Sequence, residues 1–260
     1  MDSAPSFQKF EQRPPSPQNA IDIFAGRWAS GLEDVCPGVV APGPNFFTGD
    51  KRPDFVANFF GRDGRLDGMS VLELGPLEAH HTYRLEKFGA GPILAIESNV
   101  EAFLKCLIIK EILGLNARFV LGDFTEFLKG TSDKFDLVIS SGVLYHMPDP
   151  ILVIELIAGV TDRCFVWTHY YDENHYTGPP LREIANPRYP EIKMYSNAND
   201  EETMHTGRWW GGNKGSYSYL RRADLLGAFA RAGLSSIEVF DETPSPADVA
   251  AITFAAYRKR

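Results

Sequence analysis

The 260-residue chain carries a net charge of −8, from 26 basic and 34 acidic side chains, and 44% of its residues are hydrophobic. This composition is typical of a globular protein, and no apolar run approaches the roughly 20 residues needed to cross a bilayer. The acidic balance disfavours nucleic acid as a partner and favours a small molecule, because binding to phosphates relies on basic side chains.

The N-terminal segment, residues 1–18, is rich in proline and polar side chains, and we expect a flexible tail. It lacks the basic start, the apolar stretch and the cleavage site of a secretory signal. The three cysteines, Cys36, Cys106 and Cys164, are widely spaced and odd in number. They fit reduced thiols better than disulfides or a zinc site, so a cytoplasmic protein is expected.

Residues 19–65 precede the first predicted strand, and we expect them to form an N-terminal helical flap. Apolar residues near its start recur at helical spacing, which predicts an amphipathic helix that packs on the core. These residues are Ile21, Phe24, Trp28 and Leu32. A second, short helix is expected over residues 53–60.

From residue 70 the chain alternates between apolar strands and helices. The predicted strands cover residues 71–74, 93–97, 118–123, 135–140 and 163–169, with helices over 80–88, 100–115, 125–129 and 150–159 between them. Strands that are apolar throughout and separated by helices indicate a parallel sheet covered on both faces. We therefore predict an α/β fold with a doubly wound, mostly parallel sheet over residues 66–260.

The alternation breaks after the fifth strand, where residues 170–219 are dense in Pro, Gly and Asn and show weak periodicity. We expect an insertion there. The pattern resumes with a helix over 221–234 and two strands over 236–240 and 249–257, joined by a turn at 243–246. A helix followed by two strands predicts a hairpin that completes one edge of a seven-stranded sheet.

The first turn of the sheet, in VLELGPLEAHHT (71–82), indicates the kind of cofactor. Ligands of open parallel sheets bind beyond the carboxyl ends of the strands. A dinucleotide fingerprint G-x-G-x-x-G would begin at Gly75, but Leu77 and His80 stand at the other two glycine positions and would obstruct a diphosphate. No P-loop motif is present either. The sequence therefore predicts a cofactor that carries an adenosine without phosphates.

Further candidates follow the next three strands. Glu97 ends the second strand, where an acidic side chain can accept hydrogen bonds from ribose hydroxyls. Asp123, beside Phe124, ends the third, where a carboxylate can accept from an adenine amino group, and Ser141 follows the fourth. An acidic residue at such a place is often only a helix cap. Candidates in order at four successive strand ends nevertheless favour a nucleoside site.

The segments VLELG, AIES, LGDF and FDLVISSGVLYH resemble class I S-adenosylmethionine-dependent methyltransferases, over roughly residues 66–170. AFLKCLIIKEILGL and SGVLYHMPDP are similar to the branch that contains the bacterial tRNA wobble-uridine carboxymethyltransferase. The resemblance implies a Rossmann-like fold, S-adenosyl-L-methionine as cofactor and S-adenosyl-L-homocysteine as product. The chain departs from the superfamily at residues 76–79, where further glycines usually stand.

The resemblance also assigns roles to residues. It implies that Glu73 and Gly75 lie by the amino-acid part of the cofactor, Glu97 at the ribose, Asp123 at the adenine and residues 141–146 at the methyl-transfer site. The predicted cofactor site consists of Glu73, Gly75, Pro76, Leu77, Glu97, Ser98, Asn99, Asp123, Phe124, Ser141, Gly142 and Val143.

A sulfonium already makes its methyl group electrophilic, so the enzyme has to align an acceptor and take up its proton. Histidine suits that task at neutral pH, and all six histidines lie at or beyond predicted strand ends. We predict His146, His169 and Tyr145 as catalytic residues; His80 and His81 are alternatively caps of the first helix. The spacing in THYYDENHY (168–176) matches no standard metal motif, and no metal is predicted.

The insertion holds most of the tyrosines, together with Trp209 and Trp210. Such rings suit a lid that closes over a polar substrate, and the alternative is an aromatic subdomain that packs on itself. The leading hypothesis is methyl transfer to an oxygen or nitrogen of a small polar metabolite or sugar. No membrane partner is expected, and the oligomeric state stays open.

Three other functions remain as alternatives. The first is tRNA modification by methyl or carboxymethyl transfer, which the net charge disfavours. Basic residues of the insertion nevertheless leave room for a local patch: Arg182, Arg188, Lys193, Arg208 and Lys214. The second is a non-catalytic protein that binds an adenosine cofactor, and the third is a nicotinamide oxidoreductase, against which Leu77 and His80 argue.

Overall fold

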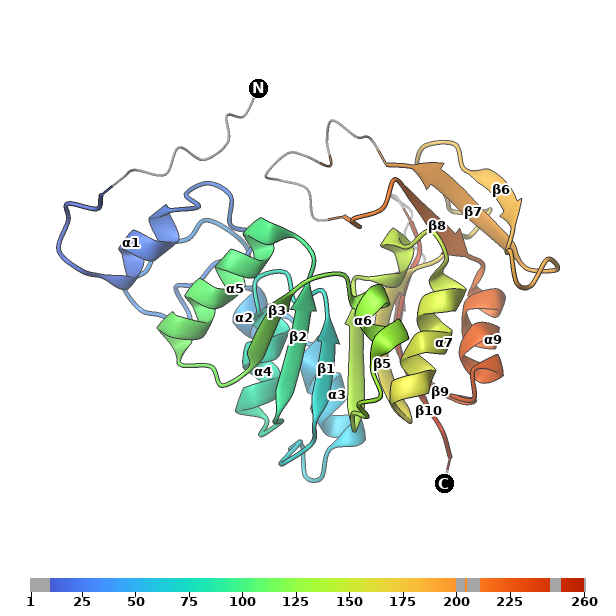
Figure 1. The fold of residues 1–260 in the computed structure, drawn as a ribbon, viewed down its shortest axis with the longest axis horizontal. Helices are drawn as coiled ribbons and strands as arrows, with labels where there is room; N and C mark the ends of the chain where they lie inside the picture. The colour runs from blue at the N-terminus through green and yellow to red at the C-terminus, as the bar shows by residue number, and fades with distance from the viewer. Residues whose placement is uncertain (1–9, 200–203, 205–210, 244–248, 260) are drawn as a thin grey trace. The chain divides into compact units, whose positions relative to one another are not determined.

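The computed structural model describes residues 10–199, 204, 211–243 and 249–259, and Figure 1 labels its helices and strands. The chain divides into two compact units. The first is built mainly from Met1–Met69 and Pro76–Gly122, and the second from Ser70–Gly75, Asp123–Met204 and Gly211–Arg260.

The strands of the main sheet have the order β3-β2-β1-β4-β5-β10-β9. They are β1 Val71–Leu74, β2 Ile93–Glu97, β3 Arg118–Leu121, β4 Leu137–Ser141, β5 Arg163–His169, β9 Ser236–Thr243 and β10 Ala251–Tyr257. β2 pairs with β3, and β4 with β1 and β5, in parallel, whereas β10 is antiparallel to β5 and β9. The predicted seven-stranded, mostly parallel sheet with a terminal hairpin is confirmed. The predicted turn after Thr243 lies outside the described residues.

The first unit contributes β2, β3 and the helices near them. These helices are α1 Pro17–Asp22, α2 Phe46–Gly49, α3 Arg52–Phe60, α4 His80–Lys87 and α5 Val100–Leu113. Asn99 caps α5, because its side chain accepts the N–H of Ala102, and Gly114 ends the helix in the left-handed conformation. The helices predicted over 53–60, 80–88 and 100–115 are therefore confirmed.

The amphipathic helix predicted near the N-terminus is wrong beyond its first turn. α1 ends at Asp22, and Gly26 has a φ of 74°, a left-handed conformation in which an α-helix does not continue. The indole Nε1 of Trp28 donates to the Ile21 carbonyl at the end of the helix, over 2.9 Å. Phe24 and Trp28 are nevertheless buried. The spacing identified the buried side chains and missed the irregular backbone that carries them.

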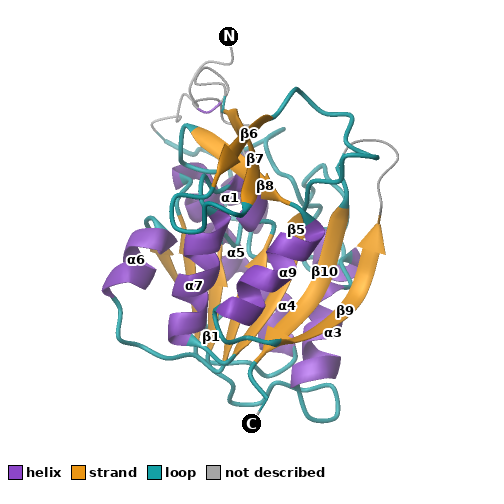
Figure 2. Cartoon of the chain, turned by 90° about the vertical axis from the view of Figure 1, so that its right-hand side faces the viewer, coloured by secondary structure: helices purple, strands orange, loops and turns teal. Residues whose placement is uncertain are grey.

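The second unit holds β1, β4, β5, β9 and β10. Its helices include α6 Phe124–Gly130, α7 Pro150–Val160 and α9 Arg222–Arg231, together with the short 3-10 helix η1, Leu144–His146. Figure 2 shows α7 and α9 side by side along these strands, and the two helices contact each other. Phe165, Phe229 and Phe254 are fully buried here. This core holds the carboxyl ends of β4 and β5 in fixed positions.

Residues 170–219 contain a small sheet that the sequence did not predict. β6 Arg182–Ala185, β7 Lys193–Ala198 and β8 Ser216–Leu220 form three antiparallel strands (Figure 2). The strands are short, β7 and β8 are rich in Ser, Asn and Tyr, and few side chains of the three strands are buried, so no apolar periodicity marks them. Trp209 and Trp210, predicted lid residues, lie outside the described residues, as do His205 and Arg208.

In the part of the chain that the structure describes, no helix has both the length and the apolar character needed to cross a membrane. The division into a tail (1–18), a flap (19–65), a main domain (66–260) and a lid stays a prediction. α1 already begins at Pro17, inside the predicted tail, and residues 1–9 lie outside the described residues.

Candidate active site

The ends of β1 and β4 lie close together in the second unit. Gly75 follows β1 with a φ of 64°, and Gly142 follows β4 with a φ of 83°, values that favour glycine. A Cβ added at Gly75 would lie 3.5 Å from Val143, and one added at Gly142 would lie 3.5 Å from the ring of Trp167. The strand order reverses between β1 and β4, which is where ligands of such sheets bind. The predicted residues Gly75, Gly142 and Val143 are thus brought together there.

Glu97 lies at the end of β2 in the first unit, with 7% of its surface exposed. The backbone N–H of Leu77 donates to its Oε2 over 3.1 Å, and that of Asn99 to its Oε1 over 2.8 Å. Burial raises the pKa of this carboxyl, and the N–H donors of Asn99, Leu77 and Ser98 act in the opposite direction. A carboxylate has about four acceptor sites, so these three donors leave room for a further one. This geometry fits the predicted ribose contact.

The turn between Gly75 and α4 adopts an unusual backbone without glycine. Leu77 and Ala79 have φ values of 55° and 63°, in the left-handed region. Each such residue costs about 1–2 kcal/mol and persists only where its surroundings hold it. Glu78, between them, is fully buried, and Glu73 and Pro76 are buried as well. The departure from the glycine pattern is therefore accommodated by backbone strain at two residues.

Asp123 ends the loop after β3 and has more partners than the sequence indicated. Its Oδ1 accepts the N–H of Thr125 over 2.8 Å and caps α6, which was the alternative to a cofactor role. Its Oδ2 lies 2.6 Å from the ammonium of Lys214. Burial raises the pKa of Asp123, but the Lys214 ammonium and the Thr125 N–H outweigh it and hold the pKa below its usual range. An adenine amino group would have to share Oδ2 with Lys214.

The three predicted catalytic residues form one aromatic cluster in the second unit. The ring centroid of Tyr145 lies 4.0 Å from that of His146 and 4.6 Å from that of His169. Trp167, which the sequence analysis did not select, completes the cluster at 5.2 Å from His169. The Nδ1 of His169 lies 3.2 Å from the carbonyl oxygen of Val249. The cluster therefore combines two imidazoles, a phenol and an indole at the ends of β4 and β5.

The imidazole of His146 is held in its neutral form. Burial lowers its pKa to about 4, and the nearby His169 contributes in the same direction. The insertion packs directly behind it, because a Cβ added at Gly212 would lie 2.5 Å from the carbonyl oxygen of His146. Ser218 of β8 also donates its N–H to the Met147 carbonyl over 2.9 Å. The insertion thus fixes the segment that carries His146.

The tyrosines of the insertion pack largely on one another. The rings of Tyr171 and Tyr195 are stacked at 3.7 Å, and Tyr219 lies 5.5 Å from Tyr217 and 6.2 Å from Tyr176. This packing agrees with the aromatic subdomain that was the alternative to a lid. A closing lid stays a prediction.

Asp50, His80 and His81 form the one group of His, Cys, Asp and Glu side chains, among the residues described, that could surround a metal ion. The Nε2 atoms of His81 and His80 lie 2.8 and 3.3 Å from Asp50 Oδ2. The Nε of Arg52 lies 2.9 Å from Oδ1 of the same carboxylate. Neither ring nitrogen of His80 has a hydrogen-bond partner, whereas metal-bound histidines are oriented by one.

These features favour a hydrogen-bond network around the Arg52–Asp50 ion pair over a metal site. The predicted absence of a metal stays a prediction. The N-cap of α4 is Ala79, and its side chain forms no capping hydrogen bond. The alternative interpretation of His80 and His81 as caps is therefore wrong.

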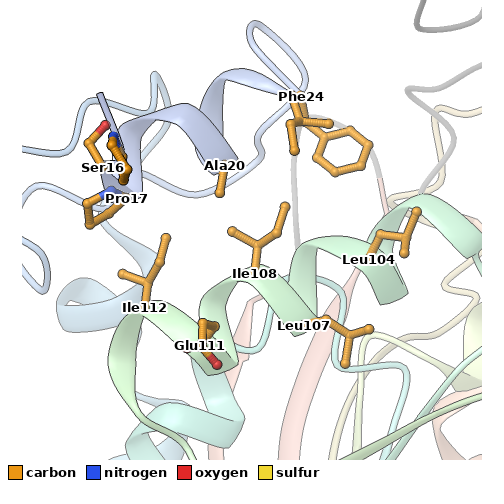
Figure 3. Close-up of a pocket in the computed structure, with 11 residues that line it drawn as sticks. Ser16, Pro17, Ala20, Phe24, Leu104, Leu107, Ile108, Glu111 and Ile112 are labelled. Carbon is orange, nitrogen blue, oxygen red and sulfur yellow. The ribbon is translucent and has the colours of Figure 1, made fainter. Parts of the chain in front are cut away.

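An apolar groove of about 840 Å³ lies between α1 and α5 in the first unit (Figure 3). Pro17 and Ala20 line one side, and Leu104, Ile108 and Ile112 line the other. None of the predicted cofactor or catalytic residues contributes to it. Nothing in the structure shows what covers this groove, so we assign it no role in the reaction.

Sequence reasoning missed several residues of the site. Trp167 and His169 are two residues apart in β5 and therefore point to the same face, a signal that was present in the sequence. Lys105 is a cation in the apolar run of α5, and its partner is Glu78 at 2.9 Å. The carbonyl of Val249 approaches His169 across a long sequence separation, and no local signal could have found it.

Comparison with known proteins identifies the class. The family model of a methyltransferase domain matches residues 66–177. The match covers less than half of the chain and indicates a methyltransferase domain there, and similar solved structures share its fold. Solved structures similar to this chain hold S-adenosylhomocysteine, the product of the predicted cofactor.

Individual relatives cover the chain to different extents. The crystal structure of the N-terminal domain of EvdMO1 with S-adenosylhomocysteine (SAH) bound has a TM-score of 0.73 at 22% identity, over 93% of this chain and 95% of that one. The same domain in the presence of SAH and D-fucose has a TM-score of 0.71 at 21% identity, with the same coverage.

A curated relative is the tRNA U34 carboxymethyltransferase of Campylobacter hominis. It is 28% identical over 91 residues, which are 35% of this chain and 31% of the relative. A second, from Psychrobacter arcticus, is 27% identical over 104 residues, 37% of this chain and 30% of the relative. The chain thus matches about a third of the length of these curated relatives.

Proposed function

We propose that the chain transfers a methyl group from S-adenosylmethionine to an oxygen or nitrogen of a small polar acceptor, with sugars as the leading class. The observation that carries this proposal is the hydrogen bond between His169 Nδ1 and the Val249 carbonyl. It belongs to the cluster of Tyr145, His146 and Trp167, which borders the switch point where the strand order reverses.

His169 is the proposed proton acceptor. A carbonyl oxygen can only accept a hydrogen bond, so the contact with Val249 requires the ring proton to be on Nδ1. Nε2 of the neutral ring then carries a lone pair. The acceptor hydroxyl transfers its proton to Nε2 as its oxygen bonds to the methyl carbon. The S–CH₃ bond breaks, and its electron pair converts the sulfonium into the thioether of S-adenosylhomocysteine.

Each unit, taken by itself, contains candidate contacts for the cofactor. In the first unit, Glu97 is proposed to accept hydrogen bonds from the ribose, beside Leu77 and Asn99. In the second unit, Gly75 and Gly142 leave room for the amino-acid part. Asp123 is proposed to meet the adenine while it shares Oδ2 with Lys214.

Two observations support a sugar as acceptor. The rings near the predicted base, Tyr145 and Trp167, offer flat apolar faces beside groups that form hydrogen bonds, a combination that suits polyhydroxylated rings. The similar N-terminal domain of EvdMO1 was crystallised in the presence of D-fucose. Sugars are therefore the first acceptors to assay.

The test is the release of S-adenosylhomocysteine with a panel of free and nucleotide-linked sugars, for the wild type and for His169→Gln. We expect kcat to fall roughly 10²- to 10⁴-fold in the variant, because the proton acceptor is lost, while the Kd for S-adenosylmethionine stays unchanged. The matched control is His175→Gln, whose ring is 45% exposed and paired with Asp172, and it should keep wild-type turnover. A His169→Gln variant as active as the wild type would contradict the mechanism.

Modification of tRNA by methyl or carboxymethyl transfer is the second candidate. The names of the curated relatives favour it. Against it, three basic side chains of the insertion are already paired: Arg188 with Asp149 and Glu155, Lys193 with Glu183, and Lys214 with Asp123. A gel shift with tRNA at increasing salt separates the two, because phosphate contacts produce a steep salt dependence. Tight, salt-dependent binding would favour tRNA.

A non-catalytic protein that binds S-adenosylmethionine is the third candidate. It predicts binding of the cofactor without release of S-adenosylhomocysteine for any acceptor in the panel or for tRNA. The neutral His146 and the oriented His169 argue against it, because a mere binding site has no need of a proton acceptor.

A further inference from the structure

Glu78 and Lys105 form a fully buried ion pair in the first unit, outside the predicted cofactor and catalytic sets. Their exposed fractions are 0% and 2%, and Lys105 Nζ lies 2.9 Å from Glu78 Oε1. The carboxylate also accepts the backbone N–H of Ala29 over 2.9 Å and that of Ser30 over 2.8 Å. Lys105 in turn donates to the carbonyl of Arg27. The pair therefore joins the turn after Gly75, the N-terminal segment and α5.

Glu78 stands between the two residues of the turn that have a left-handed backbone. Leu77 precedes it with a φ of 55°, and Ala79 follows it with a φ of 63°. Residues other than glycine keep such conformations only where their surroundings over-determine them. Glu78 directly follows Leu77, whose N–H donates to the Glu97 carboxylate. Cys106, next to Lys105 in α5, donates its thiol S–H to the Leu77 carbonyl over 3.3 Å. The N–H of Leu77 is thus held by Glu97, and its carbonyl by the residue that follows Lys105 in α5.

Stability alone gives a weak reason for such a pair. Replacement of a buried ion pair by apolar residues of similar volume is often neutral or stabilising, because both charges have to be desolvated. The carboxylate serves a structural role toward the N–H groups of Ala29 and Ser30, but that role does not require a buried lysine as its partner. The position of the pair beside the strained turn indicates a different purpose.

We propose that Glu78 and Lys105 are positioning residues for the cofactor. Their ion pair holds Leu77 and Ala79 in the left-handed conformation, so the Leu77 N–H stays on the Glu97 carboxylate. A buried anchor thereby takes the place of the glycines that this turn lacks. The proposal rests on S-adenosylmethionine as the cofactor and is independent of the acceptor.

The experiment measures the Kd for S-adenosylmethionine by calorimetry at about 10 °C, with far-UV circular dichroism to confirm folding, for Glu78→Gln and Lys105→Met. We expect the Kd to rise roughly tenfold or more in both variants. The matched control is Glu86→Gln. Glu86 also accepts two backbone N–H groups, from Asn116 and Ala117 at 3.1 and 2.5 Å, but it is not part of the strained turn. Its Kd should stay within about twofold of the wild type.

A second set of variants tests the turn itself. Glycine takes the left-handed conformation without an anchor. Leu77→Gly and Ala79→Gly, added to Glu78→Gln or to Lys105→Met, should therefore recover a large part of the lost affinity. A role in folding alone predicts no such recovery.

The proposal is overturned if folded Glu78→Gln or Lys105→Met binds the cofactor within about twofold of the wild type. It is also overturned if Glu86→Gln loses as much affinity, or if the glycine variants recover none. Failure of both Glu78→Gln and Lys105→Met to fold would make the pair a requirement for folding and would reject a positioning role. Absence of binding in the wild type would instead contradict the cofactor assignment.

Discussion

His146 is a buried imidazole whose pKa lies at about 4 in the folded chain, against 6.5 for the free side chain. Between these values the unfolded chain binds a proton that the folded chain does not. The contribution of His146 to stability is therefore complete above pH 6.5 and is lost as the pH falls toward 4. One such proton changes the free energy of unfolding by about 1.4 kcal/mol per pH unit.

The pH dependence of stability tests this protonation state. Urea unfolding between pH 7 and pH 5 should show a smaller fall in the free energy of unfolding for His146→Gln than for the wild type. His81, with a pKa lowered to about 3 by burial and by His80, keeps its own contribution in both proteins. Tyr145→Phe removes a neighbouring hydroxyl and leaves the His146 imidazole in place, so it should keep the wild-type slope. Equal slopes for His146→Gln and the wild type would contradict a neutral, buried His146.

At the residue scale, the sequence was sufficient to locate polar side chains that lie at or just beyond the end of a strand. Glu97 ends β2 as predicted, whereas Asp123, predicted to end the third strand, lies two residues beyond β3 and caps α6. The sequence could not predict which side chains form ion pairs with buried or strand-end carboxylates. Lys214 meets Asp123 from the insertion, and Lys105 meets Glu78 from α5, contacts that depend on tertiary folding and not on local spacing.

At the scale of elements, Asp123 has a structural task that can be measured separately from any cofactor contact. It caps α6 through Thr125. Asp123→Ala should lower the free energy of unfolding by about 1 kcal/mol, the usual cost of a lost cap. Thermal unfolding of the protein without cofactor should report a decrease in Tm of roughly 2–4 °C.

Asp123→Asn separates the cap from the ion pair with Lys214. The amide oxygen still accepts the Thr125 N–H, while the charge that pairs with Lys214 is lost. Because the Lys214 side chain is 40% exposed, its ion pair contributes only about 0–1 kcal/mol. The Tm of Asp123→Asn should therefore stay closer to the wild type than that of Asp123→Ala. Equal decreases would show that the cap has no part in stability.

The elements that sequence reasoning missed share a physical cause. β7 and β8 are short strands of Ser, Asn and Tyr, and their stability comes from pairing with each other and not from an apolar run. The prediction for the N-terminal segment failed in the opposite way. Its apolar residues have helical spacing, but the backbone at Gly26 is left-handed and does not continue an α-helix. The strands of the main sheet are largely buried and apolar, so their pattern alone was sufficient.

At the scale of the whole molecule, the alternation of strands and helices predicted the mostly parallel sheet, and the terminal helix and two strands predicted the antiparallel pair β9 and β10. The acidic composition disfavours a polyanion as partner. The ion pairs of the insertion also disfavour it, because they already occupy three of its basic side chains. The nature of the acceptor is set by side chains that converge from distant parts of the chain. That convergence is why the sequence could predict the class of cofactor and not the substrate.

Isothermal calorimetry of the wild type with S-adenosylmethionine, S-adenosylhomocysteine and NADH tests the central claim most directly. The Leu77 side chain stands where a dinucleotide site needs glycine, and Glu97 lies at the strand end where a ribose would bind. We therefore expect S-adenosylmethionine and S-adenosylhomocysteine to bind and NADH to give no heat of binding. Binding of NADH together with failure of S-adenosylmethionine to bind would contradict the account.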